Sequence, residues 1–270
     1  MKISTQAQSQ QAALRVWPRL LKLFAAYSRQ YVRRHFHAIR ILKSNQPPRD
    51  ISQPLVIYLN HASWWDPLVC LRLAQDFFSA RTSFAPIDSK SLRRYGFFKY
   101  LGFYGVEQTG VSGALRFLRT TCSLLGCERN AVWLTPQGHF ADVRVRPLRL
   151  QAGIGSLATR MPDVAFLPLA IEYTFWTEPR PEILVAFGQP VVPHESSVRN
   201  SADWTEFFGS ILEAEQDDLA AASQRRNPKD WIILERGASG FSGIYGAWCR
   251  LRSLMFGRTF ANGHSTEELR

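Results

Sequence analysis

The chain has 270 residues, of which 46% are hydrophobic and 20% charged, a composition typical of a folded globular protein. Its net charge of +11 indicates partners that carry negative charge, such as nucleic acid, anionic lipid or acidic substrates. The four cysteines have neither the density of a disulfide framework nor the spacing of a zinc site, so we expect them to be reduced.

The N-terminal part of the chain is basic and amphipathic. Residues 1–43 contain lysine and arginine but no Asp or Glu, and large apolar residues recur at helical spacing between Leu14 and Tyr31. This pattern predicts a helix that starts or kinks near Pro18, because proline fits the first turn. Such a helix either lies in the lipid headgroup layer or packs on the core, and its aromatic content favours the membrane.

Alternating strands and helices follow a polar, proline-rich break at residues 45–54. Strands are expected at residues 55–59, 83–87, 103–107, 131–135, 164–173 and 182–188, and helices at 68–74, 111–125, 151–161 and 206–223. This order predicts an α/β fold with a central mixed sheet flanked by helices and basic amphipathic helices at both ends. The expected units are a basic N-terminal segment (1–50), one domain (51–225) and a basic C-terminal tail (226–270).

The tail repeats the basic amphipathic pattern at residues 241–260, which contain arginines, large apolar side chains and no acid. No run of about 18 apolar residues occurs, so no segment is expected to span the bilayer. We therefore expect a peripheral protein on the cytoplasmic face of a membrane, with an anionic lipid surface as its partner.

The segment after the first strand of the expected domain carries candidate catalytic residues. His61 follows the strand at 55–59 directly, and Asp66 stands where the next helix begins. Asp66 can accept a hydrogen bond from one imidazole nitrogen, so that the other can take a proton from a substrate hydroxyl. The alternative is structural, with Asp66 capping the helix and Pro67 in its first turn. A metal site is not expected, because no second ligand stands nearby at helical spacing.

The run Asn60-His61-x-Ser63-x-x-Asp66-Pro67 resembles the first signature block of the glycerophospholipid (lysophospholipid) acyltransferase family, in which four residues separate His and Asp. Further stretches resemble the later blocks in the same order. They are residues 105–108, which are poorly preserved, residues 134–139 with 147–153, and residues 166–171. The resemblance covers residues 52–190, so it concerns most of the expected domain.

The resemblance implies an O-acyltransferase of phospholipid biosynthesis with acyl-CoA or acyl-carrier protein as the donor and no cofactor besides this co-substrate. It implies that His61 is the general base on the acceptor hydroxyl and that Asp66 orients it. It also implies that Pro136, Gln137 and Gly138 help to bind the acceptor and stabilise the oxyanion. The default acceptor of such an enzyme is a lysophospholipid.

Some positions depart from the family pattern. Gln108 and Phe140 stand where the family presents arginines that clamp a phosphate, and Gln137 replaces the usual Glu. Two explanations are open for the missing charge. One is that the phosphate is bound by a nearby cluster, namely Arg144, Arg146 and Arg149. The other is an acceptor without that phosphate, such as a glycolipid, a hydroxylated lipid or a glycosylated terpenoid.

Two hypotheses from other classes compete with the enzyme. The altered acceptor block suits a non-catalytic membrane-lipid-binding relative, although the His61–Asp66 pair is intact. The net charge suits a nucleic-acid binder, but no nucleic-acid motif is present, and we expect no nucleic-acid partner. Trp64 and Trp65 either line a substrate channel or anchor the core.

Overall fold

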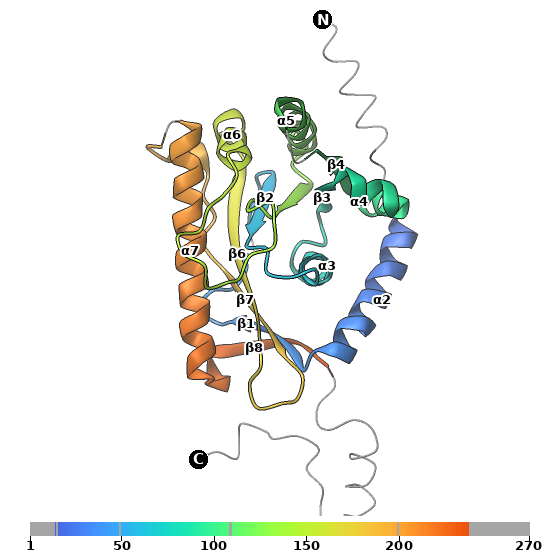
Figure 1. Cartoon of the computed structure of the whole chain (residues 1–270), viewed down its shortest axis with the longest axis vertical. Coiled ribbons are helices and arrows are strands. Elements are labelled where there is room, and N and C mark those ends of the chain that lie inside the picture. The colour runs from blue at the N-terminus through green and yellow to red at the C-terminus, as the bar shows by residue number, and fades with distance from the viewer. Residues whose placement is uncertain (1–13, 15, 49, 108–109, 199, 238–270) are drawn as a thin grey trace, which may run out of the picture.

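The computed structural model describes residues 14, 16–48, 50–107, 110–198 and 200–237 (Figure 1). Gln108 and the expected C-terminal helix at 241–260 lie outside the described residues. The strands are β1 (Ala38–Leu42), β2 (Leu55–Leu59), β3 (Thr82–Asp88), β4 (Phe103–Val106), β5 (Asn130–Leu134), β6 (Ala165–Thr174), β7 (Glu182–Phe187) and β8 (Trp231–Arg236). The helices are α2 (Pro18–His35), α3 (Asp66–Phe77), α4 (Ser89–Arg94), α5 (Val111–Leu125), α6 (Gly153–Arg160) and α7 (Ser201–Arg225), with short 3-10 helices η1 (Gly96–Leu101), η2 (Pro193–Glu195) and η3 (Pro228–Asp230).

The strands form one eight-stranded sheet in the order β4-β3-β5-β2-β6-β7-β1-β8. The first five of these run parallel to one another, whereas β7 is antiparallel to β6 and β8 is antiparallel to β1. The prediction of a mixed sheet flanked by helices is therefore confirmed. All the strands and helices expected between residues 55 and 223 are present, and α2 begins at Pro18 as predicted.

Two strands were missed in the sequence, β1 and β8. Each lies in a segment that was expected to flank the domain, so both flanking segments supply a strand to the sheet. Arg40 in the middle of β1 breaks the apolar run, yet it is buried because its Nε donates to Glu182 of β7 at 3.0 Å. This partner is 142 residues away in the sequence, so no local pattern reveals the strand.

Helices cover both faces of the sheet (Figure 1). α2 and α3 pack on one face, and α5, α6 and α7 pack on the other. None of the described helices is long and apolar enough to cross a membrane.

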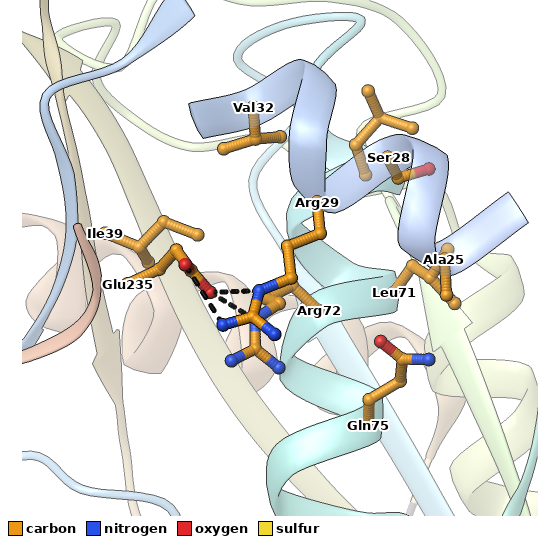
Figure 2. A pocket seen from close by; sticks show the side chains of 10 residues that line it. Ala25, Ser28, Arg29, Val32, Ile39, Leu71, Arg72, Gln75 and Glu235 are labelled. Carbon is orange, nitrogen blue, oxygen red and sulfur yellow. Dashed lines mark hydrogen bonds and ion pairs between the residues drawn. The ribbon is translucent and has the colours of Figure 1, made fainter. Parts of the chain in front are cut away.

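Glu235 of β8 ties the two helices of the first face to the sheet. Its carboxylate accepts from Arg29 Nε of α2 at 2.7 Å and from Arg72 Nε of α3 at 3.2 Å. Figure 2 shows this contact at the bottom of a pocket between α2 and α3 that Ser28 and Leu71 also line. The N-terminal helix is thus held by ion pairs as well as by apolar packing.

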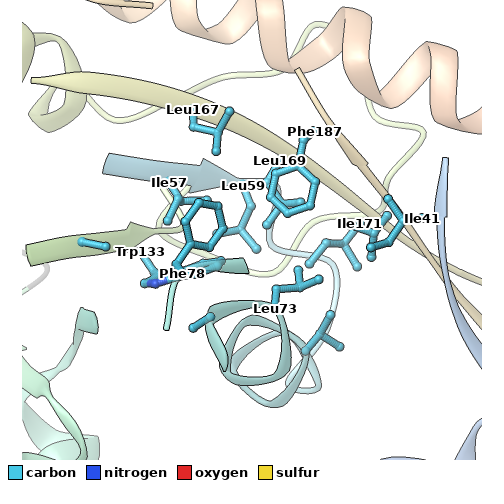
Figure 3. Close-up of a cluster of buried hydrophobic side chains, with 14 of the residues drawn as sticks. Ile41, Ile57, Leu59, Leu73, Phe78, Trp133, Leu167, Leu169, Ile171 and Phe187 are labelled. Atoms are coloured by element: carbon cyan, nitrogen blue, oxygen red, sulfur yellow. The ribbon is translucent and has the colours of Figure 1, made fainter. Parts of the chain in front are cut away.

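The core consists of two apolar layers, one on each side of the sheet. On the first face, Ile57 and Leu59 of β2 pack with Leu73 of α3 (Figure 3). On the second face, Val56 and Tyr58 of the same strand pack with the residues of α5, α6 and α7. Every residue of β2 is buried because helices cover both faces of a parallel strand. This packing on both faces fixes where along the sheet Leu59, the last residue of β2, lies.

The buried carboxylate of Glu182 gives a test of the β1–β7 pairing. Burial opposes its charge, but hydrogen bonds from His37 at 2.6 Å and from Arg40 hold the pKa of Glu182 below its ordinary value. Such a group stabilises the fold above its unfolded pKa of about 4.3, and this contribution is lost as the pH falls through the lower folded value. Glu182→Gln should lower the free energy of unfolding by about 3 kcal/mol at pH 7, because it leaves Arg40 unpaired.

Urea unfolding at pH 7 and pH 3 measures this effect, and the difference between wild type and variant should shrink at pH 3. Glu172→Gln on β6 is the control, because burial raises the pKa of Glu172 and its charge therefore opposes folding at pH 7. This control should keep or gain stability at pH 7. An equal loss in both variants would contradict the role of the Arg40–Glu182 pair.

Candidate active site

His61 lies at the carboxyl edge of the parallel strands, where β2 ends between β5 and β6. Asn60 fixes the point at which the chain leaves the sheet. Its side-chain amide donates to Ile171 O at 2.9 Å, and its Oδ1 accepts from Ile171 N at 2.9 Å. This side chain extends the β2–β6 pairing by one residue beyond Leu59. His61 therefore begins the loop from a rigid position at an edge where open α/β sheets commonly bind ligands.

The backbone of His61 is bonded to the loop that follows β5. Its N–H donates to Oε1 of Gln137 at 2.7 Å, and its carbonyl accepts from the N–H of Ala141 at 2.9 Å. In this bond the side chain of Gln137 acts only as an acceptor, and an uncharged amide oxygen can do this as well as a carboxylate oxygen. The replacement of the family's usual Glu by Gln137 is therefore compatible with this bond.

The loop itself is held in a tight turn. Gly138 has a φ of 75°, which favours glycine, and its N–H donates to Thr135 O at 3.0 Å. Pro136 O accepts from the N–H of Gln151 at 2.7 Å, which ties the turn to the start of α6. The amide of Gly138 is therefore already engaged within the turn.

The imidazole of His61 is oriented by Asp66. Nδ1 of His61 lies 2.7 Å from Oδ2 of Asp66, whose side chain is 1% exposed. Oδ2 also accepts from Ser63 N at 3.2 Å, and Oδ1 accepts from the hydroxyl of Tyr173 at 2.6 Å. Because a carboxylate only accepts, Nδ1 carries the proton and Nε2 presents a lone pair. The arrangement provides a nitrogen that can accept a proton and a buried anion that stabilises the resulting cation.

Tyr173 was missed in the sequence. It lies near the end of β6, and its distance of 107 residues from Asp66 along the chain gives no local signal of the contact. Burial and the neighbouring Asp66 carboxylate raise the pKa of Tyr173 well above its ordinary value. The phenol therefore stays protonated and acts as a donor to Asp66.

The capping alternative for Asp66 differs from the observed geometry. Asp66 is the first residue of α3, the N-cap position is Trp65, and no side chain caps this helix. Both oxygens of Asp66 instead accept from groups outside the helix, which are His61, Ser63 and Tyr173. A carboxylate in the first turn is also favoured by the helix dipole.

One aromatic ring contacts the imidazole, and two tryptophans stand in the same loop as His61. The ring centroid of Phe140 lies 4.2 Å from that of His61, and 58% of Phe140 is exposed. Trp64 is 55% exposed, whereas Trp65 is half-buried and packs on Phe36 with a centroid distance of 4.8 Å. Trp65 thus anchors the loop on the core, and Trp64 faces the surface beside the candidate site.

Two of the three arginines of the expected phosphate cluster form ion pairs with carboxylates. Arg144 forms an ion pair with Asp142, and Arg146 forms one with Asp217 of α7. Arg149 is exposed and has no ion-pair partner in the described parts of the chain. The structure therefore brings together His61, Asp66 and the Pro136–Gly138 turn, while two of the three arginines are already paired with carboxylates.

The sequence matches no protein-family model and no curated protein. The fold is similar to the crystal structure of the 1-acyl-sn-glycerophosphate (LPA) acyltransferase PlsC from Thermotoga maritima, with a TM-score of 0.52 and 15% sequence identity. The similarity covers 74% of this chain and 80% of that chain. It establishes a likeness in fold.

The tautomer of His61 gives a test of this geometry that is independent of activity. In the wild type, nitrogen-detected NMR of labelled histidine should show that the neutral form of His61 carries its proton on Nδ1 and not on Nε2. Asp66→Ala removes the acceptor, so the two tautomers should become mixed. Tyr173→Phe is the matched control, because it keeps the bond from His61 to Oδ2. A proton fixed on Nδ1 in Asp66→Ala would contradict the assignment.

Proposed function

We propose that the chain is an acyltransferase that moves a fatty acyl group from a thioester donor to a hydroxyl of a lipid acceptor. The observation that carries the proposal is the His61–Asp66 contact at 2.7 Å, with the carboxylate buried and held by Tyr173 and Ser63. The His-x4-Asp motif that resembles the acyltransferase family and the likeness in fold to PlsC support the same reaction.

The chemistry follows from the unprotonated Nε2 of His61. This nitrogen takes the proton of the acceptor hydroxyl while the hydroxyl oxygen attacks the thioester carbonyl carbon. The tetrahedral intermediate collapses with cleavage of the C–S bond, and the imidazolium returns the proton to the leaving thiolate. Asp66 stabilises the imidazolium during the step, so no covalent acyl-enzyme is required. The donor in this proposal is acyl-CoA or acyl-carrier protein, and no metal or further cofactor takes part.

We further propose that the reaction takes place at a membrane surface. Several large apolar side chains of α2 and of the α4–η1 segment are exposed, and together they define an aromatic surface. Its exposed members are Trp17, Leu23, Tyr27, Tyr95 and Phe97, and the half-buried Phe24 contacts two of them, Tyr27 and Phe97. Exposed cations flank this surface, namely Lys22, Arg93, Arg94 and Lys99. Apolar rings beside basic side chains suit the headgroup layer of an anionic bilayer.

The aromatic surface continues toward the candidate site. Tyr27 stacks on Tyr31 at 5.8 Å between ring centroids, and Tyr31 lies 6.2 Å from Trp64. Trp64 follows His61 by three residues. An acceptor lipid could thus reach the imidazole from the same apolar side that contacts the membrane.

The catalytic role is tested by His61→Ala. We expect it to lower the rate of acyl transfer by a hundredfold or more, on the order expected for a lost general base, while the melting temperature stays close to the wild-type value. The assay supplies labelled acyl-CoA or acyl-carrier protein with a mixture of lysophosphatidic acid, monoacylglycerol and alkyl glucoside. His194→Ala is the control, because this exposed histidine bonds Pro162 O on the α6 side of the sheet. Full activity of His61→Ala would falsify the assignment, and absence of transfer by the wild type would favour the lipid-binding relative.

Membrane contact is tested by Leu23→Glu. Leu23 is 71% exposed in the aromatic surface, and a carboxylate there should weaken binding to anionic vesicles by about tenfold. The matched control is Val111→Glu on α5, which is 79% exposed on the opposite side of the sheet. Vesicle sedimentation at low and high salt measures the binding. Equal effects of the two variants would argue against the aromatic surface as the contact.

A further inference from the structure

We infer that the acceptor presents its reacting hydroxyl on an uncharged group, with no phosphomonoester next to it. This inference rests on the proposed acyl transfer and concerns the same site. It follows from two features of the structure, namely how the arginines near the candidate site are paired and what occupies the exposed side of the imidazole.

The first feature is that two of the three arginines of the expected phosphate cluster, Arg144 and Arg146, already have carboxylate partners. Arg146 donates to the backbone carbonyls of Val143 at 2.8 Å and Val145 at 2.9 Å, and it also pairs with Asp217. A phosphate that recruited Arg146 would have to break these contacts. Its guanidinium is therefore committed to holding the loop against α7.

Arg144 also has a carboxylate partner, at the surface of the molecule. It makes a two-pronged contact with Asp142, with Nε donating to Oδ1 at 2.8 Å and Nη2 donating to Oδ2 at 2.6 Å. The guanidinium holds the pKa of Asp142 well below its ordinary value, so the carboxylate stays charged. Asp142 thereby takes the two-pronged position on the guanidinium of Arg144 that a phosphate would take.

The second feature is that an apolar ring contacts the imidazole, while a carboxylate lies on its buried side. Asp66 carries a buried negative charge 2.7 Å from the imidazole of His61. A phosphomonoester carries a charge of about −1.5 to −2 at neutral pH, and beside this carboxylate it needs a cation to offset the repulsion. Phe140 contacts the imidazole where the family pattern has an arginine, and an apolar ring supplies no such cation.

The aromatic rings instead suit an uncharged acceptor. Phe140, from the loop after β5, and Trp64, from the loop after β2, are both exposed. The faces of such rings can contact the C–H groups of a sugar ring or of a glycerol backbone. The hydroxyl of such a group needs only one strong interaction at the reacting atom, which is the lone pair of Nε2. The shared chemistry of these acceptors is a hydroxyl on an uncharged carbon skeleton.

The test compares acceptors that differ only in the phosphate. With the wild-type enzyme and one acyl donor, kcat/KM is measured for 1-monoacylglycerol, for lysophosphatidic acid of the same chain, and for an alkyl glucoside. We expect the better of the two uncharged acceptors to exceed lysophosphatidic acid by about tenfold or more. Preference for the glucoside would identify a sugar ring, and preference for monoacylglycerol would identify a glycerol backbone.

A variant tests the role of Phe140 directly. Phe140→Arg should raise the ratio of kcat/KM for lysophosphatidic acid over monoacylglycerol by about tenfold, because it restores a guanidinium beside the imidazole. Ile232→Arg is the matched control for an added charge, since β8 is separated from β2 by β6, β7 and β1. This control should leave the ratio unchanged.

The outcomes separate this inference from the proposed function. Preference of the wild type for lysophosphatidic acid would overturn the inference while leaving acyl transfer intact, and its loss in Arg149→Ala would identify the cation that binds the phosphate. An unchanged ratio in Phe140→Arg with a normal melting temperature would also overturn it. Absence of transfer to every acceptor would overturn the proposed function, and the inference with it.

Discussion

The candidate site depends on the position of β2 in the middle of the sheet. β2 pairs with β5 on one side and β6 on the other, and every one of its residues is buried. A shift of one residue would exchange the side chains of two differently shaped apolar layers, so the register is strongly determined. The chain therefore leaves the sheet at Leu59, and the two bonds between Asn60 and Ile171 hold the next residue at the sheet edge.

Contacts to other segments then fix both the backbone and the side chain of His61. Its amide and carbonyl are bonded to the loop after β5, its Nδ1 contacts Asp66, and one ring face contacts Phe140. The interactions that fix the imidazole come from β2, α3, β6 and the loop after β5. Rigid placement by several elements is what general-base chemistry requires, because the proton acceptor must lie within hydrogen-bond reach of the substrate hydroxyl.

Charge is distributed unevenly around this imidazole. The negative charge of Asp66 lies on the buried side, and the exposed ring of Phe140 contacts the imidazole. Under the proposed function, Asp66 stabilises the cation that forms on the imidazole, and the substrate approaches past the ring of Phe140. Under the proposed function, an anionic lipid surface would contact the exposed basic side chains of α2 and α4.

The sequence by itself determined the order and type of most elements, because buried strands and amphipathic helices leave a periodic apolar pattern and Pro18 marks a helix start. It also singled out His61 and Asp66 from their spacing and their place after a strand. The tertiary structure alone decided the strands β1 and β8, the bond from Tyr173 to Asp66 and the pairing of Arg146 with Asp217. The physical reason is that periodicity reports which side of an element is apolar, whereas the partner of a buried polar group is chosen by the distant segment that folding brings beside it.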